Sequence, residues 1–245
     1  MRKNCMSFSA ALVVFASFFL TAASSYAEIT RLTVDARISP TIGIDSLAPE
    51  FGWELTTDRY FDVDQTWYSL EVASSMETLE SGRADMWKSG EVASDRSFGV
   101  SYEGKPLRSS TRYFWRVSAR WSGFDVERNK VEKTESAVGE FVTGVMSAEE
   151  WQASWIACER TNADPMPVFF RNFTLDQKKE NVAEAFLHVC GLGQQIVSVN
   201  SIRVSDHSSV DPGWTNYKKS CLYTTFDVKK ELTSSDDCSL SVALG

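Results

Sequence analysis

The stretch that decides the fold is Arg112-Tyr113-Phe114-Trp115-Arg116-Val117-Ser118-Ala119-Arg120-Trp121. Its odd-numbered positions are large or apolar, and its even-numbered positions are mostly basic or hydroxylated. Successive side chains of a β-strand point to opposite faces of the sheet, so apolar residues with a period of two line one face. The stretch therefore predicts an antiparallel strand with one buried face and one hydrated face.

Shorter segments with strand character flank this stretch, and turn residues such as Ser39-Pro40 and Gly104-Lys105-Pro106 separate them. They cover residues 32–38, 51–55, 68–72, 98–102 and 139–143, and a single short helical segment is expected around 76–81. About seven short strands with turns between them are typical of an immunoglobulin-like or fibronectin type III sandwich. We assign this first β-sandwich to residues 28–146.

A second set of strand segments follows a different local signal. Ser147-Ala148-Glu149-Glu150 has the form of a capping box, which predicts a brief helical turn carrying Trp151 and Trp155. We place the join of two domains at residues 143–147. Strand patterns then resume at residues 168–175, 185–190, 196–200, 222–228 and 240–244. The chain is thus predicted to be all-β, with a second β-sandwich over residues 147–245.

The last of these strands, 240–244, has no later segment in the sequence to cover it. We therefore expect this strand to lie at the edge of its sheet. An edge strand exposes unpaired backbone groups, so we expect it to fray. The second sandwich is expected to be either complete or cut short at its C-terminus. In both cases we expect weaker protection against hydrogen exchange after about Asp227 than in residues 112–121.

Composition and charge exclude several classes of protein. The 245 residues are 43% hydrophobic and 24% charged, which is a globular composition rather than a disordered one. The formal charge of −8 argues against a nucleic-acid-binding protein, because neutralising phosphates requires a surplus of Lys and Arg. It also argues against a polybasic membrane-surface protein.

The first 27 residues have the parts of a secretory signal peptide. Arg2 and Lys3 form a basic start, residues 8–20 form an uncharged apolar run, and Ser25-Tyr26-Ala27 supplies small residues at the cleavage positions. The run is too short for a membrane helix, which needs about 20 residues. An uncleaved N-terminal anchor is the alternative. We expect an exported protein, secreted or periplasmic, with no membrane span after removal of the signal.

Four cysteines follow the predicted cleavage site, namely Cys158, Cys190, Cys221 and Cys238. An exported location permits disulfides, and four cysteines allow three connectivities. None shows C-x-x-C spacing, and a chain of this length can bury a normal core without bridges. One disulfide and free buried thiols both remain open at this point.

Three patterns suggest chemistry, and each has a simpler interpretation. Asp206-His207-Ser208 contains the residue types of a hydrolase triad, but neighbours along an extended chain do not converge on one point. His188 and Cys190 share one face of a strand, but no second pair completes a zinc site, so we favour core packing. Gly191-Leu192-Gly193 lacks the third glycine and the helix of a phosphate loop, which favours a turn. We assign no catalytic residue, no metal ligand and no cofactor.

The segment Asp211-Pro212-Gly213-Trp214-Thr215-Asn216-Tyr217 is the candidate binding site. Its Pro and Gly predict a turn from which two aromatic rings project. Aromatic faces stack on the apolar faces of sugar rings while short polar side chains bind hydroxyls, so Asp211, Trp214 and Tyr217 are candidate carbohydrate-binding residues. Alternatively, Trp214 and Tyr217 close the end of the sandwich core.

Several segments taken together resemble the N-terminal part of secreted bacterial α-L-rhamnosidases, a family of inverting glycoside hydrolases. Their order and spacing over nearly the whole chain carry the resemblance. The segments are Gly43-Ile44-Asp45, Pro49-Glu50-Phe51-Gly52-Trp53, Trp87-Lys88-Ser89-Gly90-Glu91-Val92, Tyr113-Phe114-Trp115-Arg116-Val117, Phe141-Val142-Thr143-Gly144, Trp151-Gln152-Ala153-Ser154-Trp155-Ile156, Cys190-Gly191-Leu192-Gly193, Asp211-Pro212-Gly213-Trp214-Thr215-Asn216-Tyr217 and Leu222-Tyr223-Thr224-Thr225-Phe226-Asp227-Val228.

The resemblance implies a fibronectin type III-like domain followed by a galactose-binding-like (jelly-roll) sandwich. In the family, further β domains and a helical (α/α)₆ barrel with the acidic catalytic residues come after these two, and this sequence stops before that barrel. The resemblance thus implies a non-catalytic N-terminal portion of an enzyme that removes terminal α-L-rhamnose, with a rhamnose-containing glycan as partner. The alternative function is a stand-alone exported module that binds carbohydrate or protein.

The sequence departs from the family at turns. The family's sandwich usually has Asn-Gly at a hairpin where this chain has Asn200-Ser201. A type I′ turn requires positive φ at both central residues, which Ser adopts poorly. We therefore expect a longer or looser hairpin here.

Overall fold

The computed structural model describes residues 27–159, 166–176, 178–205, 212–235 and 237–244. The strands of its first half are β1 (Glu28–Val34), β2 (Arg37–Ile38), β3 (Thr41–Ile44), β4 (Glu50–Thr56), β5 (Phe61–Ala73), β6 (Trp87–Lys88), β7 (Val100–Ser101), β8 (Arg112–Phe124) and β9 (Lys130–Thr143). Those of its second half are β10 (Val168–Phe173), β11 (Phe186–Cys190), β12 (Gln195–Val199), β13 (Ile202–Arg203), β14 (Tyr223–Asp227) and β15 (Cys238–Leu244). The helical elements are α1 (Met76–Glu80), α2 (Lys229–Leu232) and the 3₁₀ turns Ala148–Glu150 and Lys179–Asn181.

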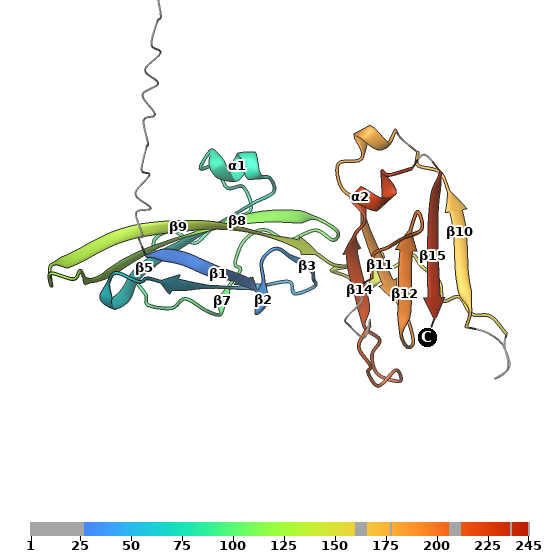
Figure 1. Ribbon diagram of the computed structural model, residues 1–245, viewed down its shortest axis with the longest axis horizontal. Helices are drawn as coiled ribbons and strands as arrows, with labels where there is room; N and C mark the ends of the chain where they lie inside the picture. The colour runs from blue at the N-terminus through green and yellow to red at the C-terminus, as the bar shows by residue number, and fades with distance from the viewer. Residues whose placement is uncertain (1–26, 160–165, 177, 206–211, 236, 245) are drawn as a thin grey trace, which may run out of the picture.

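These strands form two bodies, which confirms the predicted all-β class (Figure 1). Residues 28–143, called the first sandwich, form the sheets β2-β1-β4-β7 and β3-β9-β8-β5-β6. Residues 168–244, called the second sandwich, form the sheets β10-β15-β12-β13 and β11-β14. In Figure 1 the strands of the second sandwich run across the direction of β8 and β9. No helix in the described part of the chain combines the length and apolar character needed to cross a bilayer.

Strand β8 is the centre of the first sandwich, as the alternation of its sequence predicts. Every second side chain from Tyr113 to Trp121 is buried, and the intervening ones are partly exposed. The β8 ring of Trp115 lies 4.7 Å, centroid to centroid, from that of Phe51 on β4 in the opposite sheet. Phe51 also meets Phe141 of β9 edge-on at 6.1 Å. Such aromatic pairs contribute about 0.5–1.5 kcal/mol each beyond the area they bury.

Strand β9 begins earlier than its sequence indicates. The prediction was residues 139–143, but β9 pairs with β8 without interruption from Phe124↔Lys130 to Arg112↔Val142. A turn capped by Asp125, whose carboxylate accepts from the amides of Glu127 and Asn129, joins the two strands. The first half of β9 has charged residues on both faces, so no apolar alternation reveals it.

The expectation that the last strand is an edge strand was wrong. Strand β15 lies between β10 and β12, pairing from Val168↔Ala243 to Phe173↔Cys238 on one side and from Gln195↔Leu244 to Val199↔Leu240 on the other. The covering strand, β10, comes much earlier in the chain, so proximity in sequence could not identify it. The edges of this sheet are β10 and β13, and the Val168 and Phe170 side chains of β10 are exposed.

The hairpin at Asn200-Ser201 is tight, so the expected longer or looser loop was also wrong. Val199 pairs directly with Ile202, and the two residues between them have φ values of 49° and 63°. The Asn200 side chain donates to the Glu231 carbonyl at 2.8 Å and accepts from the Ser239 amide at 2.8 Å. These contacts with distant segments hold a type I′ turn in which Ser replaces the usual Gly.

The capped turn after the first sandwich is present but shorter than predicted. The Ser147 hydroxyl accepts from the amide of Glu149, and the 3₁₀ turn ends at Glu150. Trp151 and Trp155 therefore follow the turn in irregular chain instead of lying on it. Trp151 packs edge-on against Tyr223 at 5.2 Å, whereas Trp155 stays 67% exposed.

Candidate functional site

The aromatic turn predicted to bind carbohydrate is exposed. Trp214 is 78% and Tyr217 is 42% solvent-exposed, which excludes the alternative that Trp214 closes the sandwich core. Asn216 holds the turn, because its carbonyl accepts from the amides of Lys219 at 2.7 Å and Ser220 at 3.0 Å. Asp211 lies outside the described residues. The carbohydrate-binding role of this turn stays a prediction.

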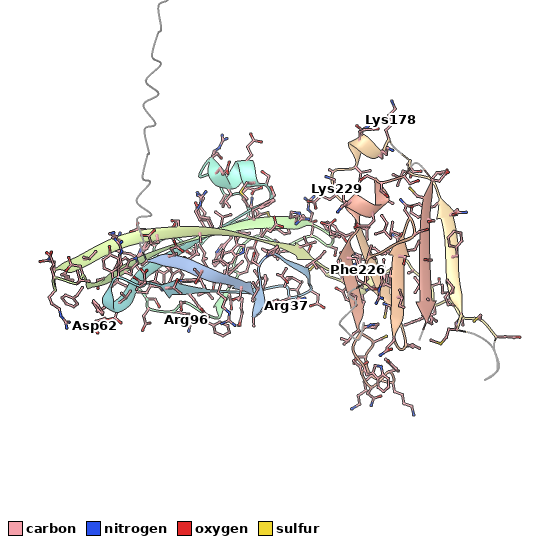
Figure 2. All side chains as sticks on the ribbon, in the orientation of Figure 1. Arg37, Asp62, Arg96, Lys178, Phe226 and Lys229 are labelled. Atoms are coloured by element: carbon pink, nitrogen blue, oxygen red, sulfur yellow. The ribbon has the colours of Figure 1, made fainter. Side chains whose placement is uncertain are left out.

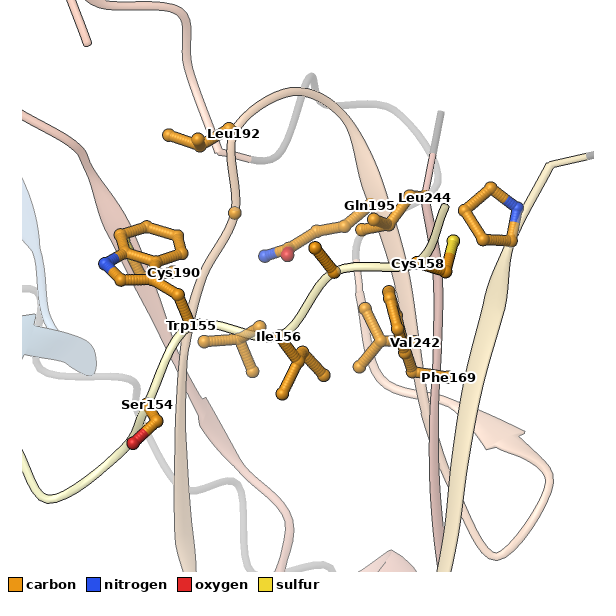
Figure 3. A pocket seen from close by; sticks show the side chains of 14 residues that line it. Ser154, Trp155, Ile156, Cys158, Phe169, Cys190, Leu192, Gln195, Val242 and Leu244 are labelled. Carbon is orange, nitrogen blue, oxygen red and sulfur yellow. The ribbon is translucent and has the colours of Figure 1, made fainter. Parts of the chain in front are cut away.

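The second sandwich contains a largely apolar cavity of about 420 Å³ (Figure 3). Its walls come from residues 154–158, β10, the end of β11, β12 and β15, and include Trp155, Ile156, Phe169, Leu192, Val242 and Leu244. The Gln195 side chain points into it; this residue is 5% exposed, and its Nε2 has no hydrogen-bond partner in the described structure. An apolar wall with one free amide donor can bind a small ring, but none of the described residues that line the cavity is an Asp or Glu able to transfer a proton.

Arg112 links the two sandwiches, and no pattern in the sequence indicated this role. Arg112, the first residue of β8, donates to Glu140 of β9 and to Glu184 and Asp227 of the second sandwich, each at 2.7 Å. Its guanidinium also lies 5.8 Å from the ring centroid of Phe186. Only arginine presents a rigid fork of five donors, which suits three carboxylates at once. Burial opposes the charge, yet the hydrogen bond and charge of Glu184, with the other two carboxylates, raise the pKa of Arg112.

His188 of β11 lies in the same junction. Its Nε2 is 2.7 Å from the Ser110 hydroxyl of the first sandwich, and its Nδ1 is 2.9 Å from the Thr225 hydroxyl of β14. A neutral imidazole has one donor and one acceptor, and a hydroxyl can match either. Burial lowers the pKa of His188, which favours the neutral ring. The side chain thus joins the sandwiches, and the expectation of simple core packing was incomplete.

Gly43 of the first sandwich and Gly144, the residue that directly follows this sandwich, make room for the strand β14. The Tyr223 hydroxyl accepts from the Val145 amide at 2.9 Å, and a Cβ on Gly144 would overlap that hydroxyl. Gly43 has φ of +77°, and a Cβ there would lie 3.1 Å from Thr225 Oγ1. A Cβ at either position would force the facing side chain of β14 to shift. We call this set of contacts the junction; it comprises Ser110, Arg112, Glu140, Gly144, Glu184, His188, Tyr223, Thr225 and Asp227.

A groove of about 320 Å³ remains beside the junction. Residues of both sandwiches line it, among them Ile42, Arg112, Phe226 and Asp227. Figure 2 places Phe226 and Lys229 on the part of the second sandwich nearest the first. The groove is open and shallow, and its carboxylates already bind Arg112, so it has no free acid–base pair.

The other candidate chemistry gains no support from geometry. Asp206-His207-Ser208 lies outside the described residues. His188 and Cys190 do not share a partner, because the histidine bonds hydroxyls while the Cys190 thiol faces Cys221. Gly191-Leu192-Gly193 is an irregular bend after β11. Across the described ranges, no group of three or more His, Cys, Asp or Glu side chains is placed to hold a metal ion.

Three described carboxyl groups have shifted pKa values, and all three shifts are downward. Burial of Asp85 opposes its charge, but hydrogen bonds from Ser74 outweigh this and lower the pKa of Asp85. Hydrogen bonds from Asn129 lower the pKa of Asp125, and one from Ser147 lowers that of Glu149. A carboxyl group with a lowered pKa stays ionised at neutral pH, so none of the three can act as a general acid.

Each half of the chain matches a known domain family. Residues 29–147 match the Rha78A-like N-terminal immunoglobulin domain, and residues 180–245 match the α-L-rhamnosidase N-terminal domain. An α-L-rhamnosidase of Formosa agariphila is 30% identical over 240 residues, covering 89% of this chain and 24% of that protein. An α-L-rhamnosidase from an Alteromonas species is 27% identical, and the match covers 93% of this chain and 25% of that protein. The chain spans about a quarter of the length of these curated relatives.

A solved structure shares the same arrangement. The α-L-rhamnosidase from Dictyoglumus thermophilum is 29% identical to this chain and superposes with a TM-score of 0.71. The match covers 91% of this chain and 25% of that one. The similarity therefore extends over both sandwiches.

Replacing Arg112 should destabilise the junction. In Arg112→Met the aliphatic stem remains, but three carboxylates lose their cation, and we expect a loss of about 1–3 kcal/mol in the free energy of unfolding. Urea unfolding followed by circular dichroism measures this loss. Arg31→Met is the matched control, because the exposed Arg31–Glu54 pair should contribute little. Equal effects of the two substitutions would contradict a special role for Arg112.

The lowered pKa of His188 predicts a pH dependence of stability. Below the unfolded pKa of about 6.5, the unfolded chain binds a proton that the folded chain does not, so stability falls as the pH falls through this value. The loss continues down to the folded pKa. His188→Gln should flatten the curve of urea midpoint against pH below about pH 6.5, because Gln stays neutral. An unchanged slope in this variant would show that another group is responsible.

Proposed function

We propose, because the chain carries the two N-terminal domains of the α-L-rhamnosidases, that it is the non-catalytic N-terminal portion of a glycoside hydrolase. The whole enzyme would remove terminal α-L-rhamnose from glycans or glycosides. The observation that carries the proposal is the match of both halves, in order, to these domains, while the chain spans about a quarter of each relative.

The chemistry of the described residues supports the non-catalytic part of this proposal. Inverting hydrolysis needs a protonated carboxylic acid and a carboxylate base roughly 6.5–9.5 Å apart, with room for water between them. Among the described residues, the wall of the apolar cavity in the second sandwich contains no carboxylate, and the carboxylates of the junction are bound to Arg112. The pKa values of Asp85, Asp125 and Glu149 are lowered, so these three carboxyl groups stay ionised near pH 7 and cannot serve as the acid.

The junction suggests what the two domains do for the enzyme. A charged network, a half-buried histidine and a close Tyr223–Gly144 approach hold the sandwiches at one relative orientation. A rigid pair of domains can act as a stem that positions further domains. We propose this scaffolding role for the chain, and an exported location, secreted or periplasmic, which the features of residues 1–27 support.

The purified chain should not hydrolyse an aryl α-L-rhamnoside. The expected rate of aryl alcohol release equals that of a heat-inactivated sample, because the described residues form no acid–base pair in a cavity. The measurement is steady-state release followed by absorbance. Release above the control that persists through a second purification would mean that this chain has its own active site.

The exposed aromatic turn favours a second candidate function, a module that binds rhamnose-containing glycans. Trp214 and Tyr217 present their rings to solvent from a hydrogen-bonded turn, and exposed rings can stack on a sugar. We expect millimolar affinity for L-rhamnose, which corresponds to about −4 kcal/mol.

Calorimetric titration of the chain with L-rhamnose tests this candidate. Trp214→Ala should weaken binding about tenfold or more, a loss of roughly 1.4 kcal/mol. Trp155→Ala is the matched control, because Trp155 is similarly exposed but lines the cavity instead. Loss of binding in the control alone would move the site to the cavity, and no binding at millimolar sugar would reject the candidate.

A further inference from the structure

Two cysteines of the second sandwich lie at the ends of neighbouring strands. Cys190 is the last residue of β11, and Cys221 comes two residues before β14 begins. The two strands pair in antiparallel register from Phe186↔Asp227 to Cys190↔Tyr223. The pairing thus brings Cys221 alongside the end of β11, although 31 positions separate the two cysteines in the sequence.

The two sulfur atoms converge on one place. Cys190 Sγ lies 3.2 Å from Cys221 Sγ. Both thiols also approach the Leu222 carbonyl, at 3.3 Å from Cys190 and 3.8 Å from Cys221. A disulfide bond is about 2.05 Å long, so the sulfurs need to approach by about 1.2 Å, which side-chain rotation can supply.

The surroundings favour a covalent bond over metal binding. A zinc site requires three or four ligands, and in the part of the chain that the structure describes no third His, Cys, Asp or Glu joins this pair. The remaining cysteines are placed differently, since Cys158 is exposed and Cys238 is buried beside the Leu232 carbonyl.

We propose that Cys190 and Cys221 form an intramolecular disulfide, with an external disulfide of the glutathione or thiol–disulfide oxidoreductase class as the oxidant. The proposal draws on the oxidising compartment that the predicted signal peptide implies. It does not depend on rhamnosidase function.

The reaction balances by two thiol–disulfide exchanges. Cys221 Sγ loses its proton and attacks one sulfur of the external disulfide, forming a mixed disulfide and releasing one thiolate. Cys190 Sγ then loses its proton and attacks Cys221 Sγ, which forms the bridge and releases the second thiolate. The chain gives up two electrons, and its two protons go to the released thiolates. Burial and the neighbouring Cys221 raise the pKa of Cys190 to about 12, so Cys190 is the poorer first attacker.

The disulfide would restrict the movement of the segment that contains Trp214 and Tyr217. The loop that it closes contains the β12–β13 hairpin and the segment with Trp214 and Tyr217. Closing a loop restricts the unfolded chain, and it also fixes the end of the aromatic turn to β11. Oxidation should therefore stabilise the second sandwich and limit the movement of the exposed rings.

Differential labelling of the full chain tests the proposal. The reduced, folded chain is incubated with a mixture of reduced and oxidised glutathione, denatured and alkylated with iodoacetamide, then reduced and labelled with a maleimide. Peptide mass spectrometry should find the maleimide on Cys190 and Cys221 and the iodoacetamide label on Cys158 and Cys238. Before reduction, the oxidised chain should be about 2 Da lighter than the reduced chain, the mass of two hydrogen atoms. Because the oxidant is supplied, a failure of export does not affect the result.

Matched variants complete the experiment. Cys158→Ser should keep the bridge, whereas Cys221→Ser should leave Cys190 with the iodoacetamide label. The oxidised wild-type chain should melt several degrees above the reduced chain, and a double Cys190→Ser, Cys221→Ser variant should show no such shift. Iodoacetamide on both Cys190 and Cys221 of the wild-type chain, or a Cys158–Cys190 linked peptide, would overturn the proposal even if the variants fail to fold.

Discussion

The contact between the two sandwiches depends on the Arg112 guanidinium. Three carboxylates, one from the first sandwich and two from the second, lie 2.7 Å from its nitrogens. Its side chain is 20% exposed, so these bonds form where water screens charge only in part. The three carboxylates carry more charge than one arginine neutralises, and this cluster therefore requires a cation at this position. The hydroxyl–imidazole contacts of His188 and the close approach of Tyr223 to Gly144 lie in the same junction as this network.

Strand β8 couples this network to the core of the first sandwich. The same strand that begins with Arg112 continues into the buried rings of Tyr113 and Trp115, which pack against Phe141 and Phe51. Dense packing in that core fixes the backbone, and the backbone fixes where Arg112 emerges. The orientation of the second sandwich is thus a consequence of how well the first sandwich is packed.

The polar groups that the structure describes serve mainly as contacts between and within the two sandwiches. The polar side chains at the junction are satisfied by one another, and the cavity of the second sandwich is walled by apolar groups with one amide. Catalysis of glycoside hydrolysis would require a carboxyl group with a raised pKa in an enclosed site. The features left free for recognition are surface ones, namely the aromatic turn and the groove beside Arg112.

Much of the fold was predictable from the sequence because its causes are local. The alternation of residues 112–121 predicted β8, the hydroxyl cap at Ser147 predicted a turn, and the order of the aromatic segments indicated the family. The start of β9 was missed, since charges on both of its faces hide the period of two.

Only the tertiary structure decided the contacts between segments that are far apart in the chain. The position of β15 inside its sheet, the tight Asn200-Ser201 turn, the partners of Arg112 and the approach of Cys190 to Cys221 are all of this kind. A residue's own neighbours determine its periodicity and its caps, but its distant partners depend on how whole sheets pack. The sequence therefore determined the all-β class and its strands, and the packing of the two sandwiches decided which side chains meet.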